Sequence, residues 1–118
     1  MRRIAVFGST GSVGRQALDV VAALPHELTV TCLAAGRSVA ALAEQVRRWQ
    51  PSCVVTGDKD VHADLKAALS GYRGDILAGP EGLAEAAARS DVDVVVSAIT
   101  GARGLPVSLS AVRAGKRL

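Results

Sequence analysis

The sequence predicts an α/β fold built on a doubly wound, mainly parallel sheet. Short apolar runs alternate with amphipathic stretches of about ten residues, which is typical of strands joined by crossover helices. The first apolar run leads directly into a glycine-rich turn and then into a helical pattern. With 118 residues, 49% of them hydrophobic, the chain is long enough for one apolar core. We therefore expect a single domain.

Five short, mostly apolar runs predict the strands. Continuous runs of Val, Ile, Leu and Ala are expected where a strand is buried on both faces of a parallel sheet. The run at 92–98 is the strongest of the five, and the run at 76–78 is the weakest. The predicted strands are residues 4–7, 28–35, 53–56, 76–78 and 92–98, and residues 116–118 look like the entry to a sixth strand.

The amphipathic stretches predict five helices, bounded by residues that start or stop a helix. Pro25 and Pro51 end the first two, because proline cannot continue a helix. Ser38 is placed to cap the second helix, with its hydroxyl accepting a hydrogen bond from a backbone N–H. Pro80 suits the first turn of the fourth helix, and Gly115 is a C-terminal stop for the fifth. The predicted helices are residues 15–24, 39–49, 61–69, 81–89 and 105–114.

Composition and charge argue against several classes of partner. The chain has only three aromatic residues, Phe7, Trp49 and Tyr72, whereas proteins that stack unpaired nucleic-acid bases need more such rings. The net charge is +3, but no run of five like charges occurs. No segment reaches the roughly 18 apolar residues of a membrane span. We expect neither a nucleic-acid partner nor a membrane partner.

The two cysteines indicate a reducing compartment. Cys32 and Cys53 are far apart in the sequence, and each lies inside an apolar run. Buried free thiols explain this placement better than a disulfide or a metal pair does. The N-terminal apolar run at 4–7 is too short for the core of a signal peptide. The sequence therefore predicts a cytoplasmic protein.

A glycine-rich turn between the first strand and the first helix predicts dinucleotide binding. Gly8, Gly11 and Gly14 have the spacing GxxGxxG, a variant of the Rossmann-like fingerprint. The first glycine permits a sharp exit from the strand, the second permits close approach of a pyrophosphate, and the third permits close packing of the helix. Thr10 and Ser12 add hydroxyl donors beside the helix N-terminus, which attracts phosphate.

The end of the second strand favours NADP over NAD. An NAD site places an acid there to bind the ribose hydroxyls, but residues 33–38 contain none. Arg37 offers a fork of donors suited to a 2′-phosphate, and Ser38 adds a hydroxyl. The alternative is that Arg37 is only solvated and Ser38 only a cap. Small residues at 97–101 either let a cofactor lie near the backbone or form a simple turn.

No catalytic residue and no metal ligand can be named from the sequence. His26 follows a helix-stopping proline and His62 opens a polar helix, and neither lies in a catalytic pattern. Asp58, Asp60 and Asp64 suggest a cation site, but the glycine and terminal glutamate of a calcium loop are missing. A solvated loop explains the three aspartates better.

Three ordered segments are more specific than the glycines alone. They are GSTGSVGRQALDVV at 8–21, LAAGRSV at 33–39 and VVSAITGARGLPVSLSAVRAGKRL at 95–118. In these segments the chain resembles the N-terminal domain of the 1-deoxy-D-xylulose 5-phosphate reductoisomerase family. That resemblance implies NADPH as cofactor, bound by Thr10, Gly11, Ser12, Val13, Gly36, Arg37 and Ser38.

The resemblance also implies a reaction and its partners. Enzymes of the family rearrange and reduce 1-deoxy-D-xylulose 5-phosphate to 2-C-methyl-D-erythritol 4-phosphate in non-mevalonate isoprenoid synthesis, use Mg or Mn, and form homodimers. The family's LANKE-type segment would follow residue 118, and its metal and substrate sites lie later still. We therefore expect residues 1–118 to be the NADPH-binding domain, truncated at the C-terminus, without the catalytic and C-terminal domains. Such a chain is expected to bind NADPH weakly and to be inactive by itself.

Two alternatives compete with this interpretation. The first is another NADP-dependent oxidoreductase with a GxxGxxG turn, which would need a catalytic cysteine or a Tyr-x-x-x-Lys pair. Neither Cys32 nor Cys53 is suitably placed, and Tyr72 is followed four residues later by Ile76. A non-catalytic nucleotide-sensing module is the second alternative, although such modules usually carry an acid at the end of the second strand.

Overall fold

A five-stranded parallel sheet forms the centre of the computed structural model, which describes residues 1–99 and 114–117. The strands are β1 (Arg2–Phe7), β2 (Leu28–Ala35), β3 (Cys53–Thr56), β4 (Asp75–Ala78) and β5 (Val94–Ser97). Their order is β4-β3-β2-β1-β5, and every neighbouring pair is parallel. The predicted doubly wound α/β fold is therefore confirmed.

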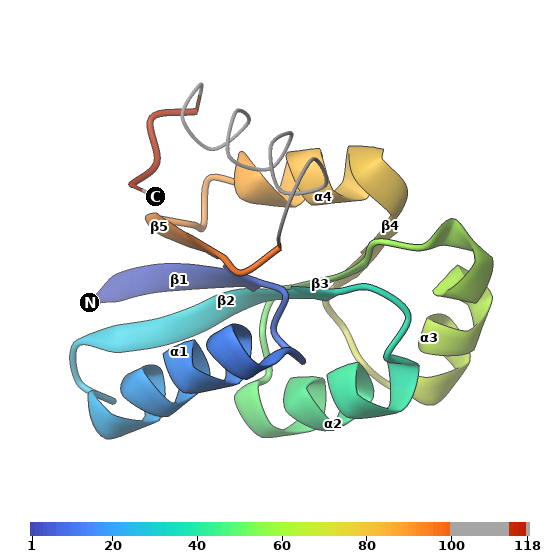
Figure 1. The fold of residues 1–118 in the computed structure, drawn as a ribbon, viewed down its shortest axis with the longest axis horizontal. Helices are drawn as coiled ribbons and strands as arrows, with labels where there is room; N and C mark the ends of the chain where they lie inside the picture. The colour runs from blue at the N-terminus through green and yellow to red at the C-terminus, as the bar shows by residue number, and fades with distance from the viewer. Residues whose placement is uncertain (100–113, 118) are drawn as a thin grey trace.

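Helices cover both faces of this sheet (Figure 1). They are α1 (Ser12–Ala23), α2 (Val39–Trp49), α3 (His62–Ala68) and α4 (Gly79–Ala87), with a 3₁₀ turn, η1 (Lys59–Val61), ahead of α3. α1 and α2 lie on one face and α4 on the other (Figure 1). The described residues thus form two apolar cores, one on each side of the sheet.

Alternate residues of β1 explain why its apolar run is continuous. Ile4 and Val6 pack into the core beneath α1, α2 and α3, and Ala5 and Phe7 pack into the core beneath α4. All four are buried. A strand covered on both faces has no solvent-facing position, so its sequence lacks the polar alternation of a half-exposed strand.

The boundaries of some elements match the prediction, and those of others, α1 among them, do not. Strands 28–35 and 53–56 and helix 39–49 are confirmed at both ends. α1 begins at Ser12, not at Arg15 as predicted, because the helix takes Gly11 as its N-cap and includes Gly14 in its first turn. A glycine is ordinarily a poor helix residue, but here close packing on the preceding turn requires it.

Three further predictions have different outcomes. Ser38 occupies the N-cap position of α2, but its hydroxyl makes no capping bond; its main-chain carbonyl instead accepts from the N–H of Leu42 at 2.9 Å. Helix 105–114 falls outside the described residues, apart from its last residue, which lies in a turn with Gly115. Arg117 forms a parallel bridge with Val94, as expected for the entry to a sixth strand.

The thiols of Cys32 and Cys53 are free and buried, as predicted, and face each other across β2 and β3.

Among the described residues, no helix has both the length and the apolar character needed to cross a membrane.

Candidate dinucleotide-binding site

The glycine turn leaves the sheet at the point where the strand order reverses. β1 has β2 on one side and β5 on the other, and the turn follows its carboxyl end. Doubly wound sheets bind their ligands in the crevice at this point. The position alone makes the turn the leading candidate for a binding site.

Gly8 makes the sharp exit from β1 that its place in the motif predicts. Its φ angle is +84°, a conformation that residues other than glycine rarely adopt. A Cβ on Gly8 would lie 3.0 Å from the carbonyl carbon of Ala98, just beyond β5. Its N–H donates to the carbonyl of Ala34 in β2 at 2.8 Å. Gly8 therefore brings the ends of three strands together.

Gly14 and Gly11 differ in the space around them. A Cβ on Gly14 would lie 2.1 Å from the carbonyl oxygen of Gly8, so only glycine lets α1 pack on the turn. At Gly11 the nearest atom to such a Cβ is the same oxygen, at the ordinary distance of 3.5 Å. Because Gly11 is exposed and has no side chain, a ligand can approach its backbone closely.

Several N–H groups of the turn have no partner within the described part of the chain. The N–H groups of Gly8 and Ser9 both donate to Ala34, and that of Gly11 donates to Gly8 at 3.1 Å. Those of Thr10 and of the first residues of α1 make no such bond. The first turn of α1 also contains no acid, so the partial positive charge of the helix N-terminus is not neutralised there. An anion is the natural partner of this arrangement.

The loop after β2 presents the predicted Gly36, Arg37 and Ser38, all exposed. The hydroxyl of Thr56 donates to the carbonyl of Gly36 at 2.6 Å and fixes the loop to the end of β3. The guanidinium of Arg37 pairs with the carboxylate of Asp58, although 65% of the Arg37 side chain is exposed. Sequence reasoning missed this contact and assigned Asp58 to a solvated loop.

A cavity of about 570 Å³ lies between these loops, within the range of small-molecule sites. It is lined at the ends of β1 and β2 by Gly8, Gly36 and Arg37, on the α4 side by Leu83, and beyond β5 by Ile99. The structure therefore brings the first glycine of the turn and the Arg37 loop around one space. Thr10, Gly11, Ser12 and Val13 do not line this cavity. Of these four, Thr10 is half-buried and the other three are exposed.

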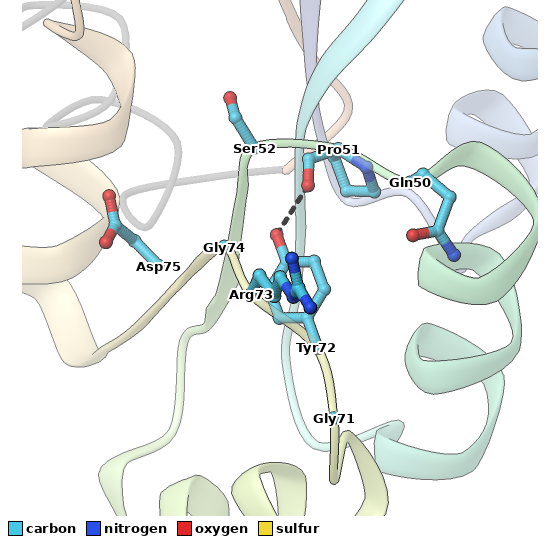
Figure 2. A pocket seen from close by; sticks show the side chains of 8 residues that line it. All are labelled: Gln50, Pro51, Ser52, Gly71, Tyr72, Arg73, Gly74 and Asp75. Atoms are coloured by element: carbon cyan, nitrogen blue, oxygen red, sulfur yellow. Dashed lines mark hydrogen bonds between the residues drawn. The ribbon is translucent and has the colours of Figure 1, made fainter.

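A second hollow, of about 550 Å³, lies at the other end of the strands and contains none of the predicted site residues. Figure 2 shows it between the segments that lead into β3 and β4. The Tyr72 hydroxyl donates to the carbonyl of Pro51 at 2.6 Å, and burial raises the pKa of that hydroxyl. The tyrosine therefore joins two segments and stays protonated.

The histidines and acids singled out in the sequence do not assemble into a catalytic group. A ring nitrogen of His62 lies 3.2 Å from the carbonyl oxygen of Ile76, and His26 is exposed. Asp58 accepts from the N–H of Asp60 at 2.8 Å and so starts η1. Within residues 1–99 and 114–117, no three His, Cys, Asp or Glu side chains are grouped to hold a metal ion.

Comparison with known proteins identifies the family. A family model described as 1-deoxy-D-xylulose 5-phosphate reductoisomerase matches residues 4–118. The chain belongs to this family. The reductoisomerase of Chloroherpeton thalassium is 40% identical over 116 residues, which cover 98% of this chain and 30% of the relative. That of Pelodictyon phaeoclathratiforme is 43% identical over 118 residues, covering 100% and 31%.

Solved reductoisomerase structures share the fold. A crystal structure of DOX-P reductoisomerase in complex with NADPH, fosmidomycin and magnesium superposes with a TM-score of 0.95 at 34% identity, covering 99% of this chain and 29% of that one. The Zymomonas mobilis reductoisomerase in complex with NADPH gives 0.90 at 36% identity, covering 98% and 30%. The chain thus spans about 30% of the length of the reductoisomerases that it matches.

Proposed function

We propose that residues 1–118 form the NADPH-binding domain of an enzyme that rearranges and reduces 1-deoxy-D-xylulose 5-phosphate to 2-C-methyl-D-erythritol 4-phosphate. The observation that carries the proposal is that the glycine turn and the Arg37 loop lie together at the carboxyl ends of the strands, where Gly8 and Arg37 line one cavity. Family membership supplies the reaction. Two solved relatives that contain NADPH support the choice of cofactor.

The residues at this edge fit the cofactor. The tight packing at Gly8 and Gly14 shapes the turn, and Gly11 leaves its backbone open to a pyrophosphate. Arg37 supplies a cation for the 2′-phosphate. When bound, NADPH supplies the hydride for the reduction. In this proposal the pyrophosphate is held by Thr10, Gly11, Ser12 and Val13, and the phosphorylated ribose by Gly36, Arg37 and Ser38.

A comparison of NADPH with NADH tests the proposal. We expect the chain to bind NADPH in preference to NADH, and we expect Arg37→Met to weaken NADPH binding about 10- to 100-fold with little change for NADH. NMR titration of the ¹⁵N-labelled chain detects weak binding and locates it. Arg73→Met is a matched control, since this exposed arginine lines the hollow at the other end of the strands (Figure 2). Equal affinity for the two nucleotides in the unsubstituted chain would refute the NADPH assignment.

The remaining partners belong to the enzyme as a whole. Because the chain spans about 30% of its relatives, we assign the divalent cation, Mg or Mn, and the phosphosugar substrate to later parts of the family's chain. A relative solved in complex with magnesium and fosmidomycin supports the use of a divalent cation by the enzyme. The proposal includes a homodimeric enzyme in the cytoplasm, where two buried thiols remain reduced. Light scattering of the enzyme and cell fractionation test these two points.

A further inference from the structure

The glycine turn is held by a side chain from another element, Gln45 of α2. The Nε2 group of Gln45 donates a hydrogen bond to the main-chain carbonyl of Ser9 at 2.8 Å. The two residues are 36 positions apart in the sequence. α2 is fixed to the sheet by the buried Leu42 and Val46, so Gln45 attaches the turn to a rigid support.

Peptide geometry gives this bond a directional effect. The described part of the chain contains no cis peptide, and in a trans peptide the C=O and N–H groups point in opposite directions. Because the carbonyl of Ser9 faces Gln45, the N–H of Thr10 in the same peptide faces away from α2. Among the described residues that N–H has no hydrogen-bond partner. It is therefore a fixed donor that is available to a ligand.

A second observation at the same contact points to function. The Oγ of Ser9 and the Oε1 of Gln45 are both buried, and neither has a hydrogen-bond partner within the described part of the chain. Leaving buried polar atoms unpaired costs stability. A contact that served stability alone would avoid this cost, whereas functional sites commonly carry it. The arrangement thus favours a role for Gln45 in shaping the turn.

We propose that Gln45 is a positioning residue that holds the Ser9–Thr10 peptide so that the N–H of Thr10 binds the cofactor's pyrophosphate. This inference rests on the NADPH-binding function proposed above. Gln45 acts through the carbonyl of Ser9, and Arg37 binds the 2′-phosphate independently of it. Loss of Gln45 should therefore weaken ligands that contain a pyrophosphate and spare a ligand that offers only the 2′-phosphate.

Two variants and two ligands test the proposal by NMR titration of the labelled chain. Gln45→Met removes the donor, and Gln45→Glu keeps the shape of the side chain while its carboxylate cannot donate. We expect each to bind NADPH about tenfold more weakly and to bind 2′-AMP, which has no pyrophosphate, within about twofold of the unsubstituted chain. Without ligand, in a chain labelled with both ¹³C and ¹⁵N, the carbonyl ¹³C resonance of Ser9 should shift as its hydrogen bond is lost.

Every outcome of these titrations decides the question. Unchanged NADPH affinity in Gln45→Met overturns the proposal, because a loss confined to Gln45→Glu comes from repulsion between its added charge and the pyrophosphate. An equal loss for NADPH and 2′-AMP, which indicates general loosening, overturns it too. Glu44→Met, at the neighbouring exposed position of α2, is the matched control and should leave both affinities unchanged. If the unsubstituted chain binds neither ligand, the proposed function itself fails, and the role of Gln45 fails with it.

Discussion

The carboxylate of Asp58 pairs with the guanidinium of Arg37, the group that we expect to bind the 2′-phosphate. Arg37 pairs with Asp58 across the loops that follow β2 and β3. A 2′-phosphate at Arg37 must compete with this carboxylate and lie beside its negative charge. The pair is worth about 1 kcal/mol or less, because Arg37 is largely solvent-exposed. We expect Asp58→Asn to bind NADPH about three- to fivefold more tightly and NADH with unchanged affinity.

This variant keeps the local structure, because asparagine also accepts the N–H of Asp60 that starts η1. Titration of both nucleotides measures the effect. Asp60→Asn removes a charge from an exposed position two residues away and serves as the control. Weaker NADPH binding in Asp58→Asn would mean that Asp58 orients Arg37 for the phosphate and does not compete with it.

The role of a single residue can be predicted from the sequence when the local backbone alone determines that role. The roles of Gly8 and Gly14 follow from the motif, since a missing Cβ has the same consequence in every strand–turn–helix unit. The contacts made by Asp58 and Gln45 span 21 and 36 residues. They depend on how β2, β3 and α2 pack, and no local pattern in the sequence contains that information.

At the scale of elements, Arg89 joins the C-terminal end of α4 to the amino ends of the strands. Its guanidinium donates two hydrogen bonds to Asp91, at 3.0 and 3.1 Å, and one to Asp75 at 2.8 Å. Asp91 also accepts from the hydroxyl of Ser52 before β3, and its carbonyl accepts from Thr31 in β2 at 2.9 Å. This network lies at the opposite end of the strands from the candidate site.

The network makes stability depend on pH. Hydrogen bonds from Arg89 lower the pKa of Asp91 from its ordinary value of 3.8. Its stabilising contribution is therefore complete above that value and is lost as the pH falls through the lower folded-state pKa. We expect Asp91→Asn to reduce the free energy of unfolding by about 1–2 kcal/mol at pH 7, and the difference to shrink toward pH 3.

Urea unfolding of the two chains between pH 7 and pH 3 measures this difference. Asp19→Asn, at an exposed position on α1, should leave the unfolding free energy nearly unchanged across the range. A deficit in Asp91→Asn that stays constant with pH would show that the ion pair contributes nothing and that the loss comes from packing.

The boundaries of helices and strands were predictable where local sequence signals determine them. They were less predictable where contacts with other elements determine them. α2 ends as expected beside Pro51, and β3 and the second half of β2, residues 32–35, are fully buried, as their apolar runs predict. α4 runs from Gly79 to Ala87, two residues earlier than predicted at both ends. Arg89 lies beyond the end of the helix, and its guanidinium binds Asp75 and Asp91. The contact with Asp75 is tertiary and cannot be read from helical periodicity.

In the molecule as a whole, the Arg89 network and the candidate binding site lie at opposite ends of the strands. The two apolar cores extend along both faces, and the Arg89 network joins the amino ends of the strands. The carboxyl ends carry the glycine turn, the Arg37 loop and the cavity. Substitutions at the two ends should therefore separate into effects on unfolding and effects on nucleotide binding.

The same division predicts binding without turnover for a polypeptide of these 118 residues. It spans about 30% of the reductoisomerases that it matches, and our proposal assigns the metal and substrate sites of the enzyme to the remainder. With NADPH, 1-deoxy-D-xylulose 5-phosphate and Mg²⁺ or Mn²⁺, we expect nucleotide-dependent NMR shifts at the glycine turn but no loss of NADPH absorbance. The full-length Zymomonas mobilis enzyme is the positive control. Turnover by the 118-residue chain would place catalytic groups among these residues and contradict the division.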